Sequence, residues 1–146
     1  MSTDIGTLNE MIEVLNDGKK FYQEASNEVR HFELKSLFGR MARTKEAIAA
    51  DLKTAVRASG TKPADGGSLA GTLRKAYAEA RAKLSSDKDY VYVAQLEEFE
   101  DRILNAFKDA AVKSDDPSVR TIAQRHMPEV VRDHNEMRTL KHVRTA

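Results

Sequence analysis

Apolar residues recur at alternating spacings of three and four along most of this chain, and few residues interrupt the pattern. Such spacing places apolar side chains along one face of an α-helix. The chain has only 7 glycines and 3 prolines among 146 residues, so there are few places at which a helix is forced to end. Alanine, leucine, glutamate, lysine and arginine, which all favour helix, are abundant. The sequence therefore predicts an all-α protein made of long helices.

The periodic stretches predict four long helices and one short one. The long helices are expected at residues 7–30, 34–56, 90–111 and 117–141, and the short one at residues 68–84. A capping box from Thr7 to Glu10 is expected to begin the first helix, and Gly60 is expected to end the second. Residues 90–93 have a strand-like composition, but the helical period continues through them, so we predict helix there. Pro128 is expected to kink or break the last helix, with His126 beside the kink.

The helix lengths also predict a topology. The short helix spans about 25 Å at 1.5 Å per residue, enough to carry the chain from one end of a bundle back to the other. Two antiparallel hairpins joined by such a crossover form a ferritin-like arrangement. We therefore predict a ferritin-like up-down four-helix bundle, as a single domain over residues 1–146. An extra short crossover helix is expected between helix 2 (residues 34–56) and helix 4 (residues 90–111).

The charges nearly cancel, with 24 basic against 23 acidic residues, and there is no cysteine. The lack of cysteine excludes a disulfide scaffold, a thiol enzyme and a cysteine-based zinc site. A net charge of +1 provides no bulk attraction for nucleic acid or an anionic membrane, so we expect neither as a partner. No targeting segment or membrane span is apparent, and we expect a cytoplasmic protein.

The charges are nevertheless unevenly distributed along the chain. Residues 1–31 contain six acidic and three basic side chains, and residues 119–146 contain six basic and three acidic ones. This asymmetry predicts either that the first and last helices are neighbours or that two molecules meet head to tail. A second contact that could form a homo-oligomer is a dimer patch made of Tyr90, Tyr92 and Phe99. We favour the alternative that these aromatic residues cover the short helix.

Four polar residues interrupt the apolar helix faces, and they are the informative ones. They are Lys45, Glu100, His126 and His134. In one interpretation, Lys45 and Glu100 form a buried ion pair, and the Tyr22 hydroxyl, Glu97 and His134 complete its hydrogen bonds.

In the other interpretation, Glu97, Glu100 and His134 bind a divalent metal such as iron, manganese or zinc, since oxygen and imidazole ligands suit these ions. The hairpin geometry is expected to bring Glu97 level with His134, and to place Lys45 opposite Gly18, where the missing side chain leaves room. An inward Lys45 argues against a metal, because its ammonium group repels cations.

The order and spacing of several residues resemble a family of small bacterial ferritin-like four-helix-bundle proteins of unknown function. The residues that carry the resemblance are Leu8, Asn9, Asp17, Gly18, Phe21, Glu24, Ala25, Leu37, Phe38, Arg43, Gly67, Ser68, Gly71, Glu100, Asp101 and His134. Ferritin-like di-iron proteins place a glutamate on each of two helices and Glu-x-x-His on the other two. Only Glu100 and His134 match this pattern, and Lys45 and Ile48 stand where the second helix would carry its Glu-x-x-His.

The resemblance therefore implies a degenerate ligand set. We expect a protein that is not an enzyme and holds no cofactor, acting as a structural or interaction module with an unidentified protein partner and a link to stress. The alternative is a metal-binding protein with a reduced carboxylate and histidine site in the bundle core.

Overall fold

Long helices make up most of the described chain. A computed structural model of the protein describes residues 2–67 and 88–145. They form α1 (Ser2–Glu28), α2 (Phe32–Ala58), α4 (Lys88–Lys113) and α5 (Pro117–Thr145). The short helix expected at residues 68–84 lies outside the described residues. Across residues 2–67 and 88–145, none of the helices combines the length and the apolar character that crossing a membrane requires.

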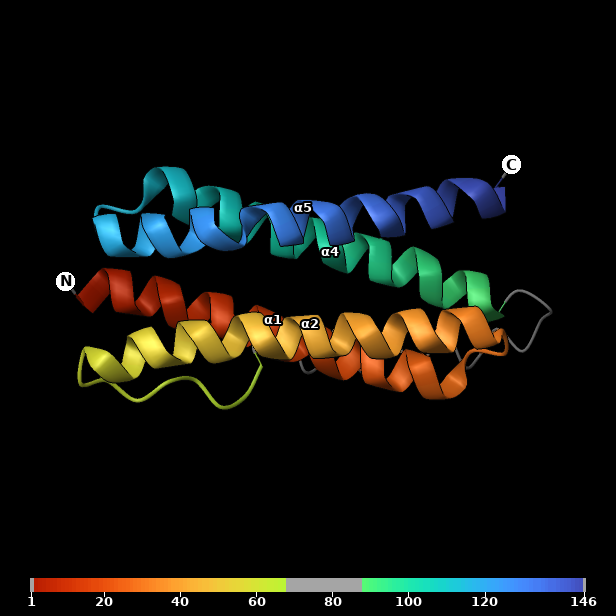
Figure 1. The fold of residues 1–146 in the computed structure, drawn as a ribbon, viewed down its shortest axis with the longest axis horizontal. Coiled ribbons are helices and arrows are strands. Elements are labelled where there is room, and N and C mark those ends of the chain that lie inside the picture. The colour runs from red at the N-terminus through yellow and green to blue at the C-terminus, as the bar shows by residue number, and fades with distance from the viewer. Residues whose placement is uncertain (1, 68–87, 146) are drawn as a thin grey trace.

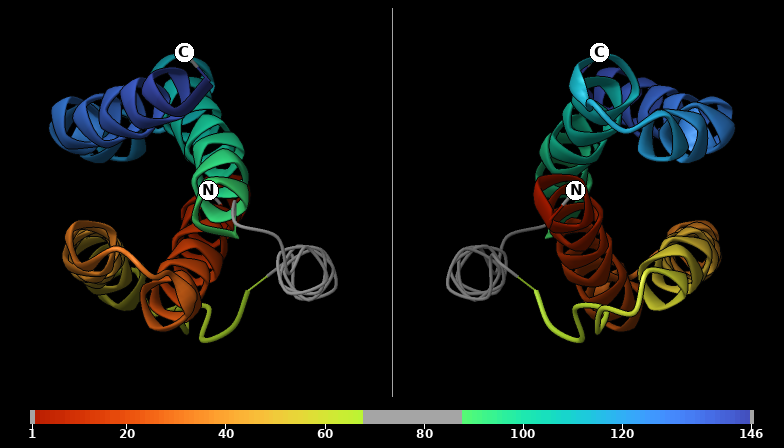
Figure 2. Two further views of the ribbon diagram at one scale, coloured as in Figure 1. Left: turned by 90° about the vertical axis from the view of Figure 1, so that its right-hand side faces the viewer. Right: turned by 90° about the vertical axis from the view of Figure 1, so that its left-hand side faces the viewer.

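The helices pack in pairs as an all-α four-helix bundle. In Figure 1, α1 and α2 form one antiparallel hairpin, and α4 and α5 form a second one. The hairpins join mainly where α1 packs on α4, and α2 meets α5 on the other side (Figure 2). Helices α1 and α5 consequently lie on a diagonal of the bundle. The prediction that the acidic first helix and the basic last helix are neighbours is therefore wrong, and the docking of α4 against α1 is the reason.

The described part of the connection between the hairpins, residues 59–67, runs back along α1. Helix α2 ends at one end of the bundle and α4 begins at the other (Figure 1). The side chain of Asn9 accepts a hydrogen bond from the Ala64 N–H at 2.8 Å, and Asn16 donates one to the Gly66 carbonyl at 3.1 Å. Gly60 ends α2 as predicted, with a φ of 84° in the left-handed region that favours glycine.

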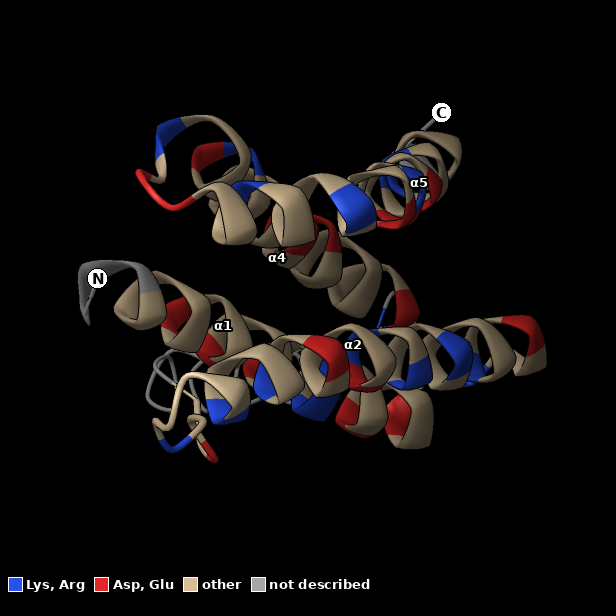
Figure 3. Cartoon of the chain, turned by 60° about the vertical axis from the view of Figure 1, so that its left-hand side comes forward, with Lys and Arg blue, Asp and Glu red and all other residues tan. Residues whose placement is uncertain are grey.

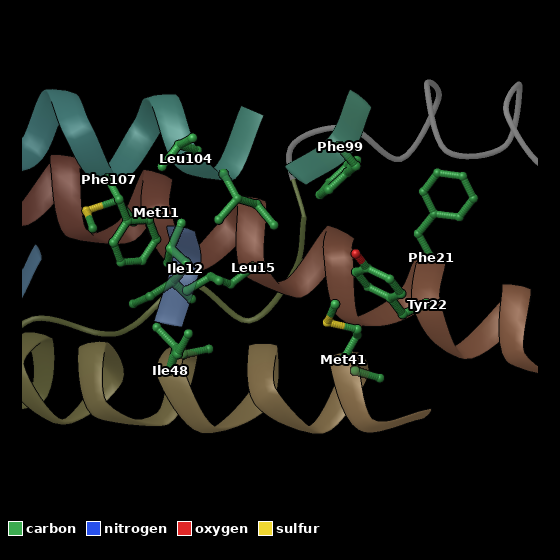
Figure 4. Packing of buried hydrophobic residues seen from close by; sticks show 14 of the residues in the cluster. Met11, Ile12, Leu15, Phe21, Tyr22, Met41, Ile48, Phe99, Leu104 and Phe107 are labelled. Carbon is green, nitrogen blue, oxygen red and sulfur yellow. The ribbon is translucent and has the colours of Figure 1, made fainter. Parts of the chain in front are cut away.

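Apolar side chains from all four helices fill the centre of the bundle, and Figure 4 shows part of this packing. A Cβ atom on Gly18 would lie 3.2 Å from the Phe99 ring and 3.3 Å from the Ile103 side chain. Gly18 therefore allows α1 and α4 to approach each other closely. The prediction that Gly18 makes room for Lys45 is wrong, because the side chains that fill this space come from α4.

The aromatic residues of α4 pack inside the bundle. The Phe21 ring lies edge-on to Phe99, with 6.1 Å between centroids, and to Tyr92 at 6.4 Å. Tyr92 and Phe99 are buried by this packing. A dimer patch built on them is therefore contradicted, since their rings face α1.

Two expectations about helix boundaries also change. Helix α1 already begins at Ser2, so Thr7 and Glu10 lie inside the helix and form no capping box at its start. Helix α5 is continuous through Pro128, which therefore does not break it. Residues 90–93 are helical, as the period predicts.

Candidate functional site

A lysine from α2 lies at the centre of the bundle between two carboxylates. The Nζ atom of Lys45 is 2.9 Å from Asp133 Oδ2, 3.0 Å from Glu100 Oε2 and 3.2 Å from Glu100 Oε1. The side chains of all three residues are fully buried. The ammonium group therefore bridges α4 and α5 from its position on α2.

Tyr22 of α1 completes this group. Its hydroxyl donates a hydrogen bond to Glu100 Oε2, and the Lys45 Nζ lies 5.5 Å from the centroid of its ring, within the range of a cation–π interaction. Figure 4 shows the Tyr22 ring projecting from α1 into the core beside Met41 of α2. Tyr22, Lys45, Glu100 and Asp133, hereafter the buried cluster, thus represent one residue from each of the four helices.

Burial and charge act against each other in the buried cluster. Burial alone would lower the pKa of Lys45, but Glu100 and Asp133 raise it above its usual value. Burial raises the pKa of Glu100 and that of Asp133, and the Lys45 ammonium opposes both shifts. Burial, with the Glu100 charge, raises the pKa of Tyr22 well above 10.0. Lys45 and Tyr22 therefore stay protonated at neutral pH and serve as hydrogen-bond donors.

The two carboxylates differ in how fully they are hydrogen-bonded. Both oxygens of Glu100 accept a hydrogen bond, from Tyr22 and from Lys45. Asp133 accepts one on Oδ2, and its buried Oδ1 has no hydrogen-bond partner among the residues that the structure describes. A buried oxygen without a hydrogen-bond partner costs folding free energy. The hydrogen bonds that Lys45 and Tyr22 donate to the two carboxylates offset this cost, so each side chain of the cluster depends on the others.

The residues proposed as metal ligands contact different partners. Glu100 lies in the buried cluster, His134 Nε2 lies 2.5 Å from Asp101 Oδ1 on the bundle surface, and Glu97 Oε1 lies 3.7 Å from Lys141 Nζ. No group of three or more His, Cys, Asp or Glu side chains within residues 2–67 and 88–145 is arranged to hold a metal ion. The contact of His134 with Asp101 places the α4–α5 pairing one turn from the expected alignment of His134 with Glu97. Metal binding stays a prediction.

Sequence reasoning missed Asp133. The expected apolar face of α5 passed through Val130, His134 and Met137, with a spacing of four and then three. A spacing of three and then four from Val130 leads to Asp133 instead and is equally helical. Asp133 is fully buried, whereas His134 keeps contact with solvent. The sequence signal for Asp133 is that it fits the apolar face of this helix as well as the adjacent His134 does.

Further ion pairs join α2 to α5 on either side of the buried cluster. Arg40 Nη2 lies 2.9 Å from Glu136 Oε1. Asp51 Oδ2 lies 2.9 Å from Arg125 Nη1 and 2.6 Å from His126 Nε2. The hydrogen bond with His126 and the nearby Arg125 hold the pKa of Asp51 below its usual value. We call these contacts, together with Lys45 and Asp133, the polar α2–α5 interface.

The fold and the buried cluster define an all-α four-helix bundle with a charged centre. Residues 4–113 match the family described as "Domain of unknown function (DUF2383)". Because this match covers most of the chain, the protein belongs to that family. No curated protein matches the chain. The matched range contains Tyr22, Lys45 and Glu100, whereas Asp133 lies beyond it on α5.

Proposed function

We propose that this protein is a ferritin-like helical bundle that acts as a non-catalytic structural or interaction module. Two antiparallel hairpins, with α2 ending at one end of the bundle and α4 beginning at the other, support the ferritin-like assignment. The charged centre supports the non-catalytic role, because the hydrogen bond from Tyr22 and both ion pairs of Lys45 are made within the cluster. A bacterial source, a cytoplasmic location and a link to stress stay predictions.

The observation that carries the proposal is the position of the Lys45 ammonium. It lies within 3.2 Å of oxygens from two fully buried carboxylates. Carboxylate bundles of the ferritin-like class hold metal ions between carboxylates projecting from facing helices. In this protein the ammonium supplies the positive charge at such a position, and it repels a divalent cation.

Elemental analysis before and after reconstitution with iron, manganese or zinc tests the proposal. The unmodified protein is expected to retain only substoichiometric metal. Lys45→Ala removes the ammonium and leaves the oxygens of Tyr22, Glu100 and Asp133 facing one space, so this variant is expected to retain more metal. The matched control is Lys20→Ala, which changes an exposed lysine and is expected to behave as the unmodified protein does.

One equivalent of metal in the unmodified protein, lost in Glu100→Gln, would contradict the proposal and favour the metal-binding alternative. Loss of stability in Glu100→Gln without any change in metal content would support the structural role. Circular dichroism of each variant shows whether it keeps its helical fold, so that metal content is compared only between folded proteins.

A further inference from the structure

A groove of about 550 Å³ lies between the first half of α1 and the last half of α4. Apolar side chains form its floor, with Met11 and Val14 on the α1 side and the small residues Ala106 and Ala110 on the α4 side. The groove lies at the end of the bundle that carries the N-terminus and the α4–α5 turn (Figure 1).

The two walls of the groove have the spacing of a helix-binding surface. The lining residues of α1 are at positions 7, 10, 11 and 14, and those of α4 are at positions 106, 109, 110 and 113. Each set repeats as i, i+3, i+4 and i+7, which is one face of a helix followed for two turns. Two such faces side by side suit the apolar face of a third helix about two turns long.

The rim of the groove is acidic. Glu10, Asp109 and Asp115 line it, against a single base, Lys113, which lies 3.5 Å from Asp109. Figure 3 shows acidic segments on α1 and in the α4–α5 turn at this end of the bundle. An occupant with basic residues flanking an apolar position would match this rim in charge.

The last turns of α5 have that chemistry. Residues 138–144 include Arg138, Lys141 and Arg144 and contain no acidic residue. Among them, Val143 is 66% exposed, which is uncommon for a large aliphatic side chain. Residues 138–145 also span about two helical turns, the length of the groove.

We propose that the groove binds the C-terminal turns of α5 from a second copy of this protein. Val143 would lie over Ala106 and Ala110, and the flanking Arg138 would face the acidic rim. Because the groove and the C-terminal end of α5 lie at opposite ends of the molecule (Figure 1), neither can reach the other within one copy. The contact is therefore head to tail, and a dimer keeps a free groove on one copy and a free α5 end on the other, so that further copies can add.

Sedimentation velocity over a range of protein concentrations tests this inference. The unmodified protein is expected to form dimers and longer species at high concentration. Glu10→Lys with Asp115→Lys changes exposed groove residues, and Arg138→Glu with Val143→Asp changes exposed residues of the α5 end. Each pair of substitutions is expected to weaken self-association at least about tenfold, because it places like charges opposite each other.

Mixing the two variants gives the sharpest result. The groove variant still has an intact α5 end, and the α5 variant still has an intact groove, so the mixture is expected to form one-to-one dimers that grow no further. Val112→Asp is the matched control, because Val112 is 78% exposed and lies outside both surfaces. It is expected to associate as the unmodified protein does.

The inference is overturned if the unmodified protein stays monomeric at every concentration, if the mixture forms no dimers, or if Val112→Asp weakens association as strongly. It rests on the proposed interaction role and names a partner for it. Its failure is distinguishable from failure of the proposed function, because metal content reports on Lys45 and is independent of self-association.

Discussion

At the scale of single residues, Lys45 is the side chain on which the most other groups depend. Its ammonium contacts both buried carboxylates and lies over the Tyr22 ring. Removing one partner of a buried ion pair leaves uncompensated charge in the core, which is far more destabilising than the pair itself is stabilising.

Lys45→Met is therefore expected to lower the free energy of unfolding by about 3–5 kcal/mol. Urea unfolding followed by circular dichroism measures the change. Lys20→Met, at an exposed position, is the control and should change stability by less than about 0.5 kcal/mol. Equal effects of the two substitutions would show that the buried cluster has no special role in stability.

Two adjacent glycines provide a matched pair for a second residue-scale test. A Cβ atom on Gly67 would lie 1.6 Å from the Oδ1 atom of the buried Asp17, whereas a Cβ atom on Gly66 would meet nothing within 4 Å. Gly67→Ala is expected to lower the unfolding free energy by about 1–3 kcal/mol, because the Asp17 carboxylate must move within a packed site. Thermal unfolding of both variants checks this, and Gly66→Ala should melt close to the unmodified protein.

At the scale of elements, Asp89 fixes the start of α4 to the α1–α2 turn. Its carboxylate accepts hydrogen bonds from the backbone N–H groups of Arg30, at 2.8 Å, and His31, at 3.0 Å. It also lies 2.7 Å from His31 Nδ1. Burial raises the pKa of Asp89, but these hydrogen bonds lower it by more, so it lies below its usual value.

The lowered pKa predicts how stability depends on pH. A carboxyl group with a lower pKa in the folded state stabilises the fold above its unfolded pKa, and this contribution is lost as the pH falls through the folded pKa. Asp89→Ala is therefore expected to reduce the unfolding free energy by about 2–3 kcal/mol at neutral pH. The difference from the unmodified protein should shrink below about pH 4. A difference that is constant with pH would contradict the role of the Asp89 charge.

Pro128 allows a test of how α5 forms. Proline within a helix removes one backbone hydrogen bond and crowds the preceding turn, yet α5 continues through it, and Pro128 is exposed. Pro128→Ala is expected to stabilise the protein by about 1–3 kcal/mol, since it restores the hydrogen bond. Urea unfolding checks the sign, with the exposed Thr121→Ala as the control within the same helix.

The helices themselves could be predicted because long apolar faces determine them. Helix α2, expected at residues 34–56, forms at Phe32–Ala58, and residues 90–93 are helical despite their composition. Positions that depend on a single turn could not be predicted as well. Ser2 rather than Thr7 begins α1, and Asp133 rather than His134 faces Lys45, because adjacent residues on a helix can fit the same apolar face.

At the scale of the whole molecule, two unlike interfaces join the hairpins. The α1–α4 interface is apolar and close, with Phe99 packed against Gly18 and Phe21. The α2–α5 interface is polar, and its outer pairs are partly exposed to solvent. The pairing of hairpins could not be derived from the sequence, because periodicity identifies buried faces without saying which helix each face meets.

Salt should therefore distinguish the two interfaces. Asp51→Ala removes a partly exposed pair and is expected to lower the unfolding free energy by about 1 kcal/mol, with a smaller effect at high salt. Phe99→Ala is expected to lower it by about 3–5 kcal/mol at any salt concentration, because it leaves a cavity. Urea unfolding of both variants at low and high sodium chloride measures these effects, and equal salt dependence would contradict the distinction.

The buried cluster is divided between the two hairpins. Lys45 belongs to the first hairpin, and both of its carboxylate partners belong to the second. Neither hairpin can neutralise its own charges in the buried cluster. A slip of one helical turn between them would separate the ammonium from both Glu100 and Asp133, whereas apolar faces alone tolerate such a slip more readily. The charges at the centre therefore select a single register for the assembly of the two hairpins.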